Sequence, residues 1–369
     1  MILVIKAIAI TALFSSTAIS AQEKIEKEIT YTNAKAFPIY GQAFVPSDTS
    51  RYQRLPMSYK NKCRQPLWYL GTESAGLYVR FRSNSTAIYA KWSSMYKNSM
   101  NHMTDTGTRG LDLYALVDGK WQFVSSGRPG KKKETSAMIV GNMKPEMREY
   151  MLYLSLYDGI DSLEIGVASG STLDQPEISS PSTEKPIIMY GTSILQGGCS
   201  SRPGMAFTNI IGRKLDKEVV NLGFSGNALL DYEIAELMAE IPDPGIYILD
   251  YVPNASVDEI NRKGEKFFRI LRDAHPKVPI IFLEDPIYPH SFFDLAIKSE
   301  LDKKNAAQEN LFQKLKASGE KRIYFLKSTN EIGNDNEATV DGIHFTDLGM
   351  FRYSQFIMPA IKKALKTNK

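Results

Sequence analysis

A serine and a histidine that lie far apart along the chain are the residues best suited to carry out a reaction together. Ser193 ends the segment YGTS, where a short apolar run stops abruptly at small residues. His344 ends the segment DGIH, three residues after Asp341. A serine hydroxyl becomes a nucleophile when a neighbouring imidazole removes its proton, and a carboxylate fixes the tautomer of that imidazole. These residue types predict Ser193 as a nucleophile, His344 as its base and Asp341 as the group that orients the base.

An attack by a serine creates a negatively charged oxygen, and two further segments carry groups that would stabilise it. Gly226 lies in GFSGN and Asn254 lies in PNAS. The backbone amides of Ser193 and Gly226 and the side chain of Asn254 supply three donors, each typically worth about 3–4 kcal/mol in a transition state. Each residue also has a structural alternative: a turn for the serine and the glycine, a helix N-cap for Asn254 and a local loop contact for Asp341. The combination of all four segments favours the chemical role.

The second half of the chain has the pattern of elements that would bring these segments together. From residue 186, apolar strands alternate with helical patterns, which predicts a parallel sheet covered on both faces. The strands are expected at 187–190, 219–224, 246–252, 280–285 and 323–328, and the helices at about 204–216, 231–241, 256–274, 299–318 and 346–366. Ligands bind beyond the carboxyl ends of such strands. We therefore expect the four segments to converge at one edge of the sheet.

The first half of the chain has a different pattern. Short segments rich in aromatic residues alternate apolar and polar positions and are separated by turn residues, with no strong helical stretch between them; examples are 76–83, 85–92, 110–125 and 148–158. This pattern predicts an antiparallel β-sandwich. Residues 168–186 are rich in Ser, Pro and Gly and are typical of a linker. The expected organisation is a sandwich domain over 22–175 and an α/β domain over 184–369.

The four segments together resemble the SGNH, or GDSL-type, hydrolase superfamily, whose name lists its Ser, Gly, Asn and His. The residues that match its blocks, in order, are Ser193, Gly226, Asn254, and Asp341 with His344. The chain departs from the family pattern at Thr192, where Asp is commonest, and it lacks the usual glycine two residues before Asn254. The resemblance covers 186–369. It implies a flavodoxin-like parallel sheet and ester hydrolysis by a Ser-His-Asp mechanism, with no metal and no organic cofactor.

The segment GLDLY (110–114) carries a second resemblance. It matches a G-x-D-L-Y signature that is similar to the β-sandwich preceding certain bacterial exported SGNH esterases, and such two-domain enzymes resemble carbohydrate esterases with an N-terminal jelly roll. The resemblance implies an esterase that removes small acyl groups, such as acetate, from a glycan or another small molecule. Two alternatives stay open. One is a lipid acylhydrolase or thioesterase that uses the same catalytic residues, although no loop predicts a long apolar groove. The other is a non-catalytic glycan-binding protein.

Composition and charge restrict the partners. The 369 residues carry a formal net charge of +4, and the one compact basic run, 131–133, is typical of a solvated loop rather than a nucleic-acid site. Residues 1–21 have the positive start, short apolar stretch and small residues of a secretory signal peptide. No other apolar run is long enough for stable insertion into a membrane. We therefore expect an exported protein, periplasmic or secreted.

The sequence leaves open the roles of several other reactive or charged residues. Cys63 and Cys199 could pair in an exported chain or remain free thiols. The two cysteines and four histidines have no close ligand spacing, which argues against a structural zinc site. His102 and His290 could reach the substrate cleft. Arg202 could bind an anionic or sugar substrate or form a structural ion pair.

Overall fold

Two antiparallel sheets form the first half of the protein. The computed structural model describes residues 28–44 and 52–366; the expected signal peptide lies outside them. One sheet has the order β1 (Ile29–Asn33), β9 (Ile160–Ala168), β4 (Ile88–Ser94) and β7 (Glu134–Val140). The other has the order β10 (Leu173–Asp174), β3 (Tyr78–Ser83), β8 (Arg148–Tyr153), β5 (Leu111–Val117) and β6 (Lys120–Gly127), with β2 (Ile39–Tyr40) also paired to β3.

The inward residues of the two sheets form one core, which makes them a sandwich. Apolar side chains alternate along each strand, so that one face of each sheet is buried. Phe81 of β3 and Leu113 of β5 pack with Ala90 and Trp92 of β4 in this core. The indole N–H of Trp92, buried in the core, donates to the backbone oxygen of Arg109 at 3.1 Å. The antiparallel pairing and the shared core confirm the predicted sandwich.

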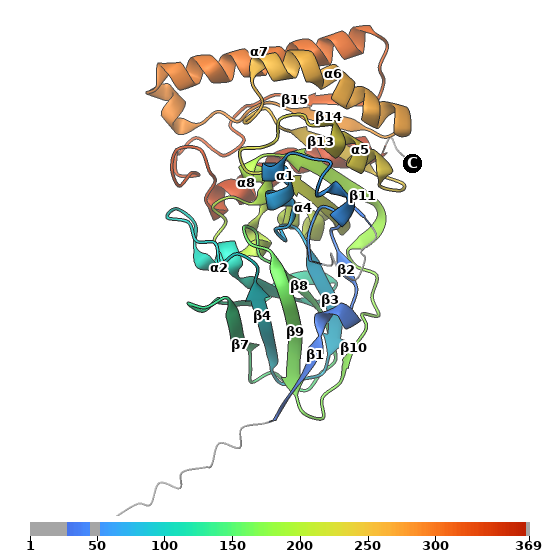
Figure 1. Ribbon diagram of the computed structural model, residues 1–369, viewed down its shortest axis with the longest axis vertical. Coiled ribbons are helices and arrows are strands. Elements are labelled where there is room, and N and C mark those ends of the chain that lie inside the picture. The colour runs from blue at the N-terminus through green and yellow to red at the C-terminus, as the bar shows by residue number, and fades with distance from the viewer. Residues whose placement is uncertain (1–27, 45–51, 367–369) are drawn as a thin grey trace, which may run out of the picture.

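A parallel sheet of five strands forms the second half. Its order is β12 (Lys217–Gly223), β11 (Ser182–Gly191), β13 (Ile246–Asp250), β14 (Ile280–Leu283) and β15 (Ile323–Leu326). The helices are α3 (Ser193–Gln196), α4 (Phe207–Leu215), α5 (Tyr232–Glu240), α6 (Val257–Ala274), α7 (Leu295–Ala317) and α8 (Asp347–Lys366). Figure 1 shows this half stacked on the end of the sandwich, with α6 and α7 farthest from it. The predicted α/β architecture is confirmed.

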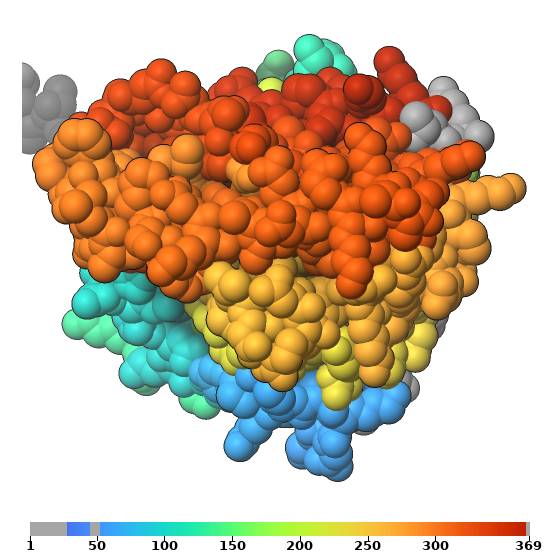
Figure 2. Space-filling model, turned by 90° about the horizontal axis from the view of Figure 1, so that it is seen from above, coloured from blue at the N-terminus to red at the C-terminus, as the bar shows by residue number. Residues whose placement is uncertain are grey.

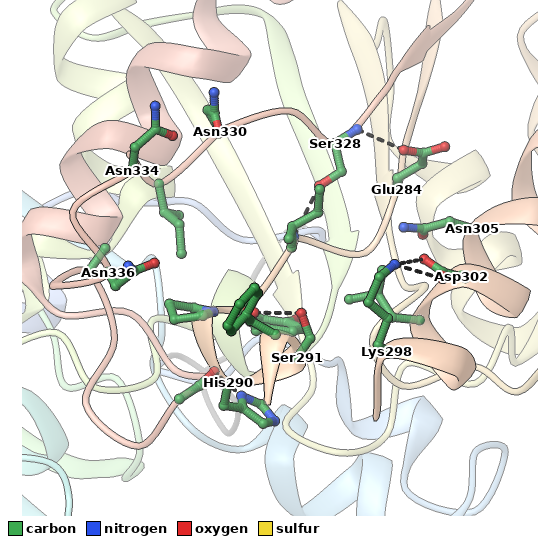
Figure 3. Close-up of a pocket in the computed structure, with 18 of the residues that line it drawn as sticks. Glu284, His290, Ser291, Lys298, Asp302, Asn305, Ser328, Asn330, Asn334 and Asn336 are labelled. Atoms are coloured by element: carbon green, nitrogen blue, oxygen red, sulfur yellow. Dashed lines mark hydrogen bonds and ion pairs between the residues drawn. The ribbon is translucent and has the colours of Figure 1, made fainter. Parts of the chain in front are cut away.

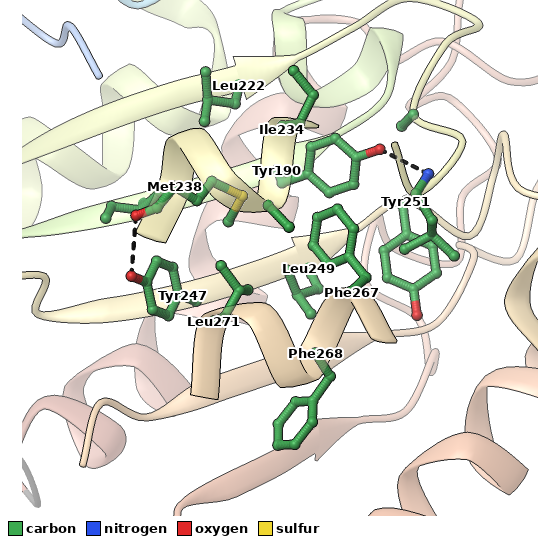
Figure 4. Close-up of a cluster of buried hydrophobic side chains, with 14 of the residues drawn as sticks. Tyr190, Leu222, Ile234, Met238, Tyr247, Leu249, Tyr251, Phe267, Phe268 and Leu271 are labelled. Carbon is green, nitrogen blue, oxygen red and sulfur yellow. Dashed lines mark hydrogen bonds between the residues drawn. The ribbon is translucent and has the colours of Figure 1, made fainter. Parts of the chain in front are cut away.

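Both faces of the parallel sheet are covered, which explains why its strands are apolar throughout. Side chains of α5, α6 and α7 pack on one face, and those of α4 and α8 pack on the other. On the first face, the rings of Tyr190 and Phe267 stack at 5.0 Å (Figure 4). Ser256 and Glu259 form a capping box that fixes the start of α6. None of the helices in the described residues has the length and apolar character needed to span a bilayer.

Two short helices in the first half belong to the junction between the domains and were not expected from the sequence. They are α1 (Gln65–Gly71) and α2 (Asp105–Arg109). Leu67 and Leu70 of α1 join the core of the α/β half. Seen from above in Figure 2, the blue surface around α1 lies directly beside the yellow surface of the α/β half. The segment therefore acts as an additional layer of the second domain.

The GLDLY segment holds the loop that follows α3. Asp112, fully buried, accepts hydrogen bonds from the guanidinium of Arg202 and from the backbone N–H of Gly204, both at 2.8 Å. The same guanidinium nitrogen lies 2.8 Å from the hydroxyl oxygen of Tyr114. Of the two roles that the sequence left open for Arg202, the structure shows the ion pair. The Asp and Tyr of the signature therefore fasten the sandwich to the other domain.

Candidate active site

Ser193, His344 and Asp341 form a continuous hydrogen-bonded chain. The hydroxyl oxygen of Ser193 lies 2.9 Å from Nε2 of His344, and Nδ1 of the same ring lies 2.7 Å from a carboxylate oxygen of Asp341. Ser193 is the first residue of α3, immediately beyond the end of β11, and the other two residues lie in the loop before α8. The edge of the sheet thus brings together residues that are 151 positions apart.

The loop that carries Asp341 is arranged so that its carboxylate stays charged. One carboxylate oxygen accepts the backbone N–H groups of Ile343 (3.0 Å) and His344 (2.8 Å), and the other accepts the ring N–H. Partial burial alone would raise the pKa of Asp341, but these hydrogen bonds outweigh it and lower the pKa to about 2. The carboxylate is therefore ionised at any ordinary pH, and it fixes the tautomer in which Nε2 of His344 accepts the serine proton.

The three expected oxyanion donors come from the ends of three adjacent strands. The amide of Ser193 lies beyond β11, Gly226 lies in the loop after β12, and Asn254 lies in the loop after β13. Gly226 has a φ of +66°, which favours glycine, and a Cβ there would meet no atom within 4 Å. The side-chain oxygen of Asn254 accepts the backbone N–H of Ala228 at 3.3 Å, which orients the amide group.

A buried polar network, which the sequence did not predict, holds the loop of Gly226. The side chain of Gln196, at the end of α3, accepts the backbone N–H of Ser225 at 3.0 Å and donates to the carboxyl group of Glu73 at 2.5 Å. Arg54, also buried, donates to the backbone oxygen of Gly223 at 2.5 Å. Two buried residues of the first half, Arg54 directly and Glu73 through Gln196, thus hold the two ends of the short segment 223–225, which leads into Gly226.

Tyr157 connects the sandwich directly to Ser193. Its hydroxyl donates to the backbone oxygen of Ser193 at 3.1 Å. Burial raises its pKa well above the ordinary value, so the hydroxyl remains a donor. Sequence reasoning missed Tyr157, Glu73 and Arg54, because an isolated charged or aromatic residue in a β-rich segment gives no sign of what it will contact.

Replacing Glu73 tests whether this network positions the loop of Gly226, called the oxyanion loop below. Burial is the largest influence on Glu73 and raises its pKa to about 8, although Arg54 and the bond from Gln196 act against it. The side chain is therefore neutral at pH 7, and Glu73→Gln should keep its activity. Glu73→Ala removes one of the acceptors of the Gln196 side-chain amide, whose nitrogen also donates to the backbone oxygen of Leu156 at 3.1 Å. A buried N–H that loses its acceptor costs about 1–3 kcal/mol, and we expect about a tenfold loss of kcat. Steady-state kinetics of both variants measure this effect, and equal rates would contradict it.

The raised pKa of Glu73 predicts that the stability of the fold depends on pH. Because the folded pKa lies above that of the unfolded chain, the folded state retains a proton that the unfolded state loses between pH 4.5 and about 8. The contribution of Glu73 is therefore complete below pH 4.5 and declines as the pH rises to about 8. Urea unfolding at pH 5 and pH 8 should show a smaller decline for Glu73→Gln than for the native chain.

The histidines and cysteines that the sequence left open have distinct places. His102 lies beside His344, with 5.5 Å between the centres of the two rings. His290 contacts the loop of Asp341 and His344 through Nδ1, which lies 2.7 Å from the backbone oxygen of Gly342. Cys63 and Cys199 are free thiols, and burial raises the pKa of Cys199 to about 12.

Two cavities lie beside this arrangement. The smaller, of about 620 Å³, lies between the domains and reaches Ser225, in the loop of Gly226, and Tyr157, which contacts Ser193. The larger, of about 1010 Å³, lies beyond the ends of β14 and β15 and reaches Gly342, in the loop of Asp341 and His344. Figure 3 shows His290 and Ser291 on one side of the larger cavity, with Asn334 and Asn336 across from them.

Comparison with known proteins identifies the family. Residues 184–362 match the GDSL-like lipase/acylhydrolase family, and residues 29–173 match the GxDLY family, described as the N-terminus of SGNH-hydrolase-type esterases. A solved structure of a candidate GDSL-like lipase from Bacteroides ovatus is 37% identical, over 92% of this chain and 98% of that one, with a TM-score of 0.87. The chain belongs to the GDSL-like lipase/acylhydrolase family. A comparison of this chain with curated proteins found no match.

More distant members of the same fold have varied activities. The salicylyl-acyltransferase SsfX3 of a tetracycline biosynthetic pathway is 15% identical over 90% of this chain and 98% of its own, with a TM-score of 0.72. A family two carbohydrate esterase from Cellvibrio japonicus is 11% identical over 93% and 99%, with a TM-score of 0.58. At these identities the likeness establishes a shared two-domain fold. It also shows that the fold, by itself, does not fix the substrate.

The departure from the GDSL pattern at Thr192 does not disturb the hydrogen-bonded chain of Ser193, His344 and Asp341. Thr192 is buried, and its hydroxyl has no hydrogen-bond partner among the residues that the structure describes. Ser193 and His344 nevertheless lie at hydrogen-bond distance. The residue before the serine therefore does not hold the nucleophile through its side chain in this family member.

Proposed function

We propose that the protein is a serine esterase that removes small acyl groups, most simply acetate, from a carbohydrate. The hydrogen-bonded chain from Ser193 through His344 to Asp341 carries this proposal. Family membership supports acyl ester hydrolysis as the reaction class. The carbohydrate esterase with the same fold supports the choice of substrate class.

The reaction follows from the positions of these groups. Nε2 of His344 takes the proton of Ser193 as the hydroxyl oxygen attacks the ester carbonyl. The amides of Ser193 and Gly226 and the side chain of Asn254 stabilise the resulting oxyanion. The imidazolium, stabilised by Asp341, then gives the proton to the departing alkoxide. Water attacks the acyl-serine in the same way and releases the carboxylic acid.

The cavity between the domains has the chemistry of a sugar site. Its lining combines an aromatic ring with amide, hydroxyl and carboxyl groups: Tyr69, Asn98, Ser99, Asn227 and Glu73. Tyr69 is 39% exposed, and its ring is held against that of Tyr96 at 4.6 Å between centroids. A sugar offers apolar ring faces to an aromatic side chain and hydroxyl groups to amides. The alcohol part of the substrate would bind there, beside the oxyanion loop.

Hydrolysis of long-chain acyl esters is a second candidate function, and the larger cavity favours it. The sequence predicted no apolar groove, but apolar side chains gather at this cavity beside the catalytic loop, among them Ile287, Phe292, Phe293 and Leu301. Phe292 and Phe293 are largely exposed. An acyl chain entering past Gly342 would lie against these residues.

A series of nitrophenyl esters separates the two functions. For the acetylesterase we expect kcat/KM for the acetate ester to exceed that for octanoate and laurate by at least about tenfold, because a small acyl pocket excludes longer chains. The opposite order would support the second candidate. Tyr69→Ala should raise KM for acetylated oligosaccharides but not for nitrophenyl acetate. Tyr89→Ala, which alters a half-buried tyrosine of the sandwich, is the matched control.

We also propose that the enzyme acts outside the cytoplasm, as the signal-like composition of residues 1–21 suggests. Fractionation of cells that express the full chain should find a shortened product outside the cytoplasm. A full-length product confined to the cytoplasm would contradict export.

A further inference from the structure

Three potential metal ligands from separate parts of the chain meet beside the nucleophile. His102 comes from the loop between β4 and α2, Cys199 from the loop after α3, and His344 from the loop before α8. One ligand atom of each lies within 4.8 Å of the other two. The positions 102, 199 and 344 are too far apart in sequence for any spacing to have predicted this cluster.

Both histidine rings are oriented by an oxygen acceptor at Nδ1. Nδ1 of His344 donates to the carboxylate of Asp341 at 2.7 Å, and Nδ1 of His102 donates to the side-chain oxygen of Asn101 at 3.0 Å. With the proton on Nδ1, the neutral ring carries its lone pair on Nε2. Histidines that bind metals in proteins are oriented by acceptors of this type on the other ring nitrogen.

The third ligand is held firmly in place. Cys199 is buried and has a φ of +70°. The backbone around it is tied down, because the N–H of Gly198 donates to the backbone oxygen of Ser193 at 2.7 Å. Bound as a thiolate, Cys199 would add one negative charge, and the carboxylate of Asp341 adds a second nearby. Together they balance a divalent cation.

We propose that His102, Cys199 and His344 form an inhibitory zinc site. Two imidazoles and a thiolate are ligands that zinc prefers. A tetrahedral site needs ligand atoms about 3.3–3.8 Å apart, so side-chain movements of about 1 Å complete it. The thiol releases its proton to water, a water molecule takes the fourth position, and no group is oxidised or reduced.

Zinc binding at this site would stop the reaction, and this part of the inference rests on the proposed esterase function. The lone pair of Nε2 on His344 accepts the proton of Ser193 at 2.9 Å. A metal ion bound to that lone pair leaves the serine proton without an acceptor. The ion would therefore act as a competitor of the nucleophile for the base.

Cobalt binding tests the site without any need for activity. Co²⁺ added to the full chain should give one equivalent of bound metal with a thiolate charge-transfer band in the near ultraviolet, and Zn²⁺ should abolish the band. Cys199→Ala and Cys199→Ser should both lose the band, whereas Cys63→Ala should keep it. The absence of the band in the native chain, or its persistence in both Cys199 variants, would overturn the proposal.

Zinc titration of ester hydrolysis tests the inhibition. Each variant is compared with its own rate in the presence of a chelator. We expect His102→Gln to raise the half-inhibitory zinc concentration at least about tenfold, and His275→Gln, a histidine at the end of α6, to leave it unchanged. Equal inhibition of His102→Gln and the native chain would refute the site. A chain without esterase activity would refute the proposed function, while the cobalt result would still decide the metal site.

Discussion

Ser193→Ala is expected to reduce ester hydrolysis by at least about a thousandfold, because members of a catalytic unit cannot replace one another. The variant loses the atom that would attack the carbonyl, while the backbone amide that contributes to the oxyanion site remains. The loss should appear in kcat, measured with nitrophenyl acetate, and the enzyme should no longer release a burst of nitrophenol. Binding of the substrate should change little.

A matched control separates chemistry from folding. Ser354→Ala removes a buried hydroxyl of α8 that donates to the backbone oxygen of Phe351 at 2.6 Å and is not part of the proposed reaction. We expect this variant to retain its rate within about twofold, while both variants unfold cooperatively. Substantial turnover by Ser193→Ala would eliminate the serine mechanism, including both candidate substrates.

Asp341→Asn is expected to reduce kcat by about 10³–10⁴-fold with little change in KM. A carboxylate accepts the ring N–H of His344 at 2.7 Å, but an asparagine in the same place can direct its N–H₂ group at Nδ1. The ring would then carry its proton on Nε2, and the hydroxyl of Ser193 would have no acceptor. The loss of about four orders of magnitude that the same change causes in a serine protease triad gives the scale.

The control for this prediction removes the same charge from a nearby position. Asp335 lies in the same polar loop region and is paired with Arg352 at 2.7 Å. Hydrogen bonding to Arg352 lowers the pKa of Asp335 to about 2, so it too is an ionised carboxylate. Asp335→Asn should leave kcat nearly unchanged. A comparable loss in both variants would mean that the loss of a negative charge in this region, and not the tautomer of His344, governs the rate.

The positions of the four candidate segments could be predicted from the sequence because their signals are local. Apolar strands that end in small or polar residues are visible as patterns of a few residues, and parallel topology brings the ends of such strands to one edge. Ser193, Gly226 and Asn254 each follow the end of a strand, as expected. The loop of Asp341 and His344 precedes α8, close to where the final helix was predicted.

The supporting residues could not be predicted, because each depends on a contact between distant parts of the chain. Glu73 and Gln196 are 123 residues apart and meet only when the two domains pack. Helix α1 was missed for a related reason: its seven residues are too few to show a helical period, and its stability comes from the neighbouring core. The larger cavity is likewise a product of packing among η4 (Pro289–Phe292), α7 and the loop after β15.

The bonds between Asp112 and the loop after α3 have a consequence for how such enzymes diverge. A sandwich without the acidic partner would leave the guanidinium of Arg202 without its carboxylate, and an α/β domain without the arginine would leave the buried carboxylate of Asp112 without its cationic partner. The two halves are therefore not independently exchangeable by recombination. A stable hybrid must contain both Asp112 and Arg202, so we expect the two domains to be inherited together. Replacing the sandwich with one from another protein would require keeping an acidic residue opposite Arg202.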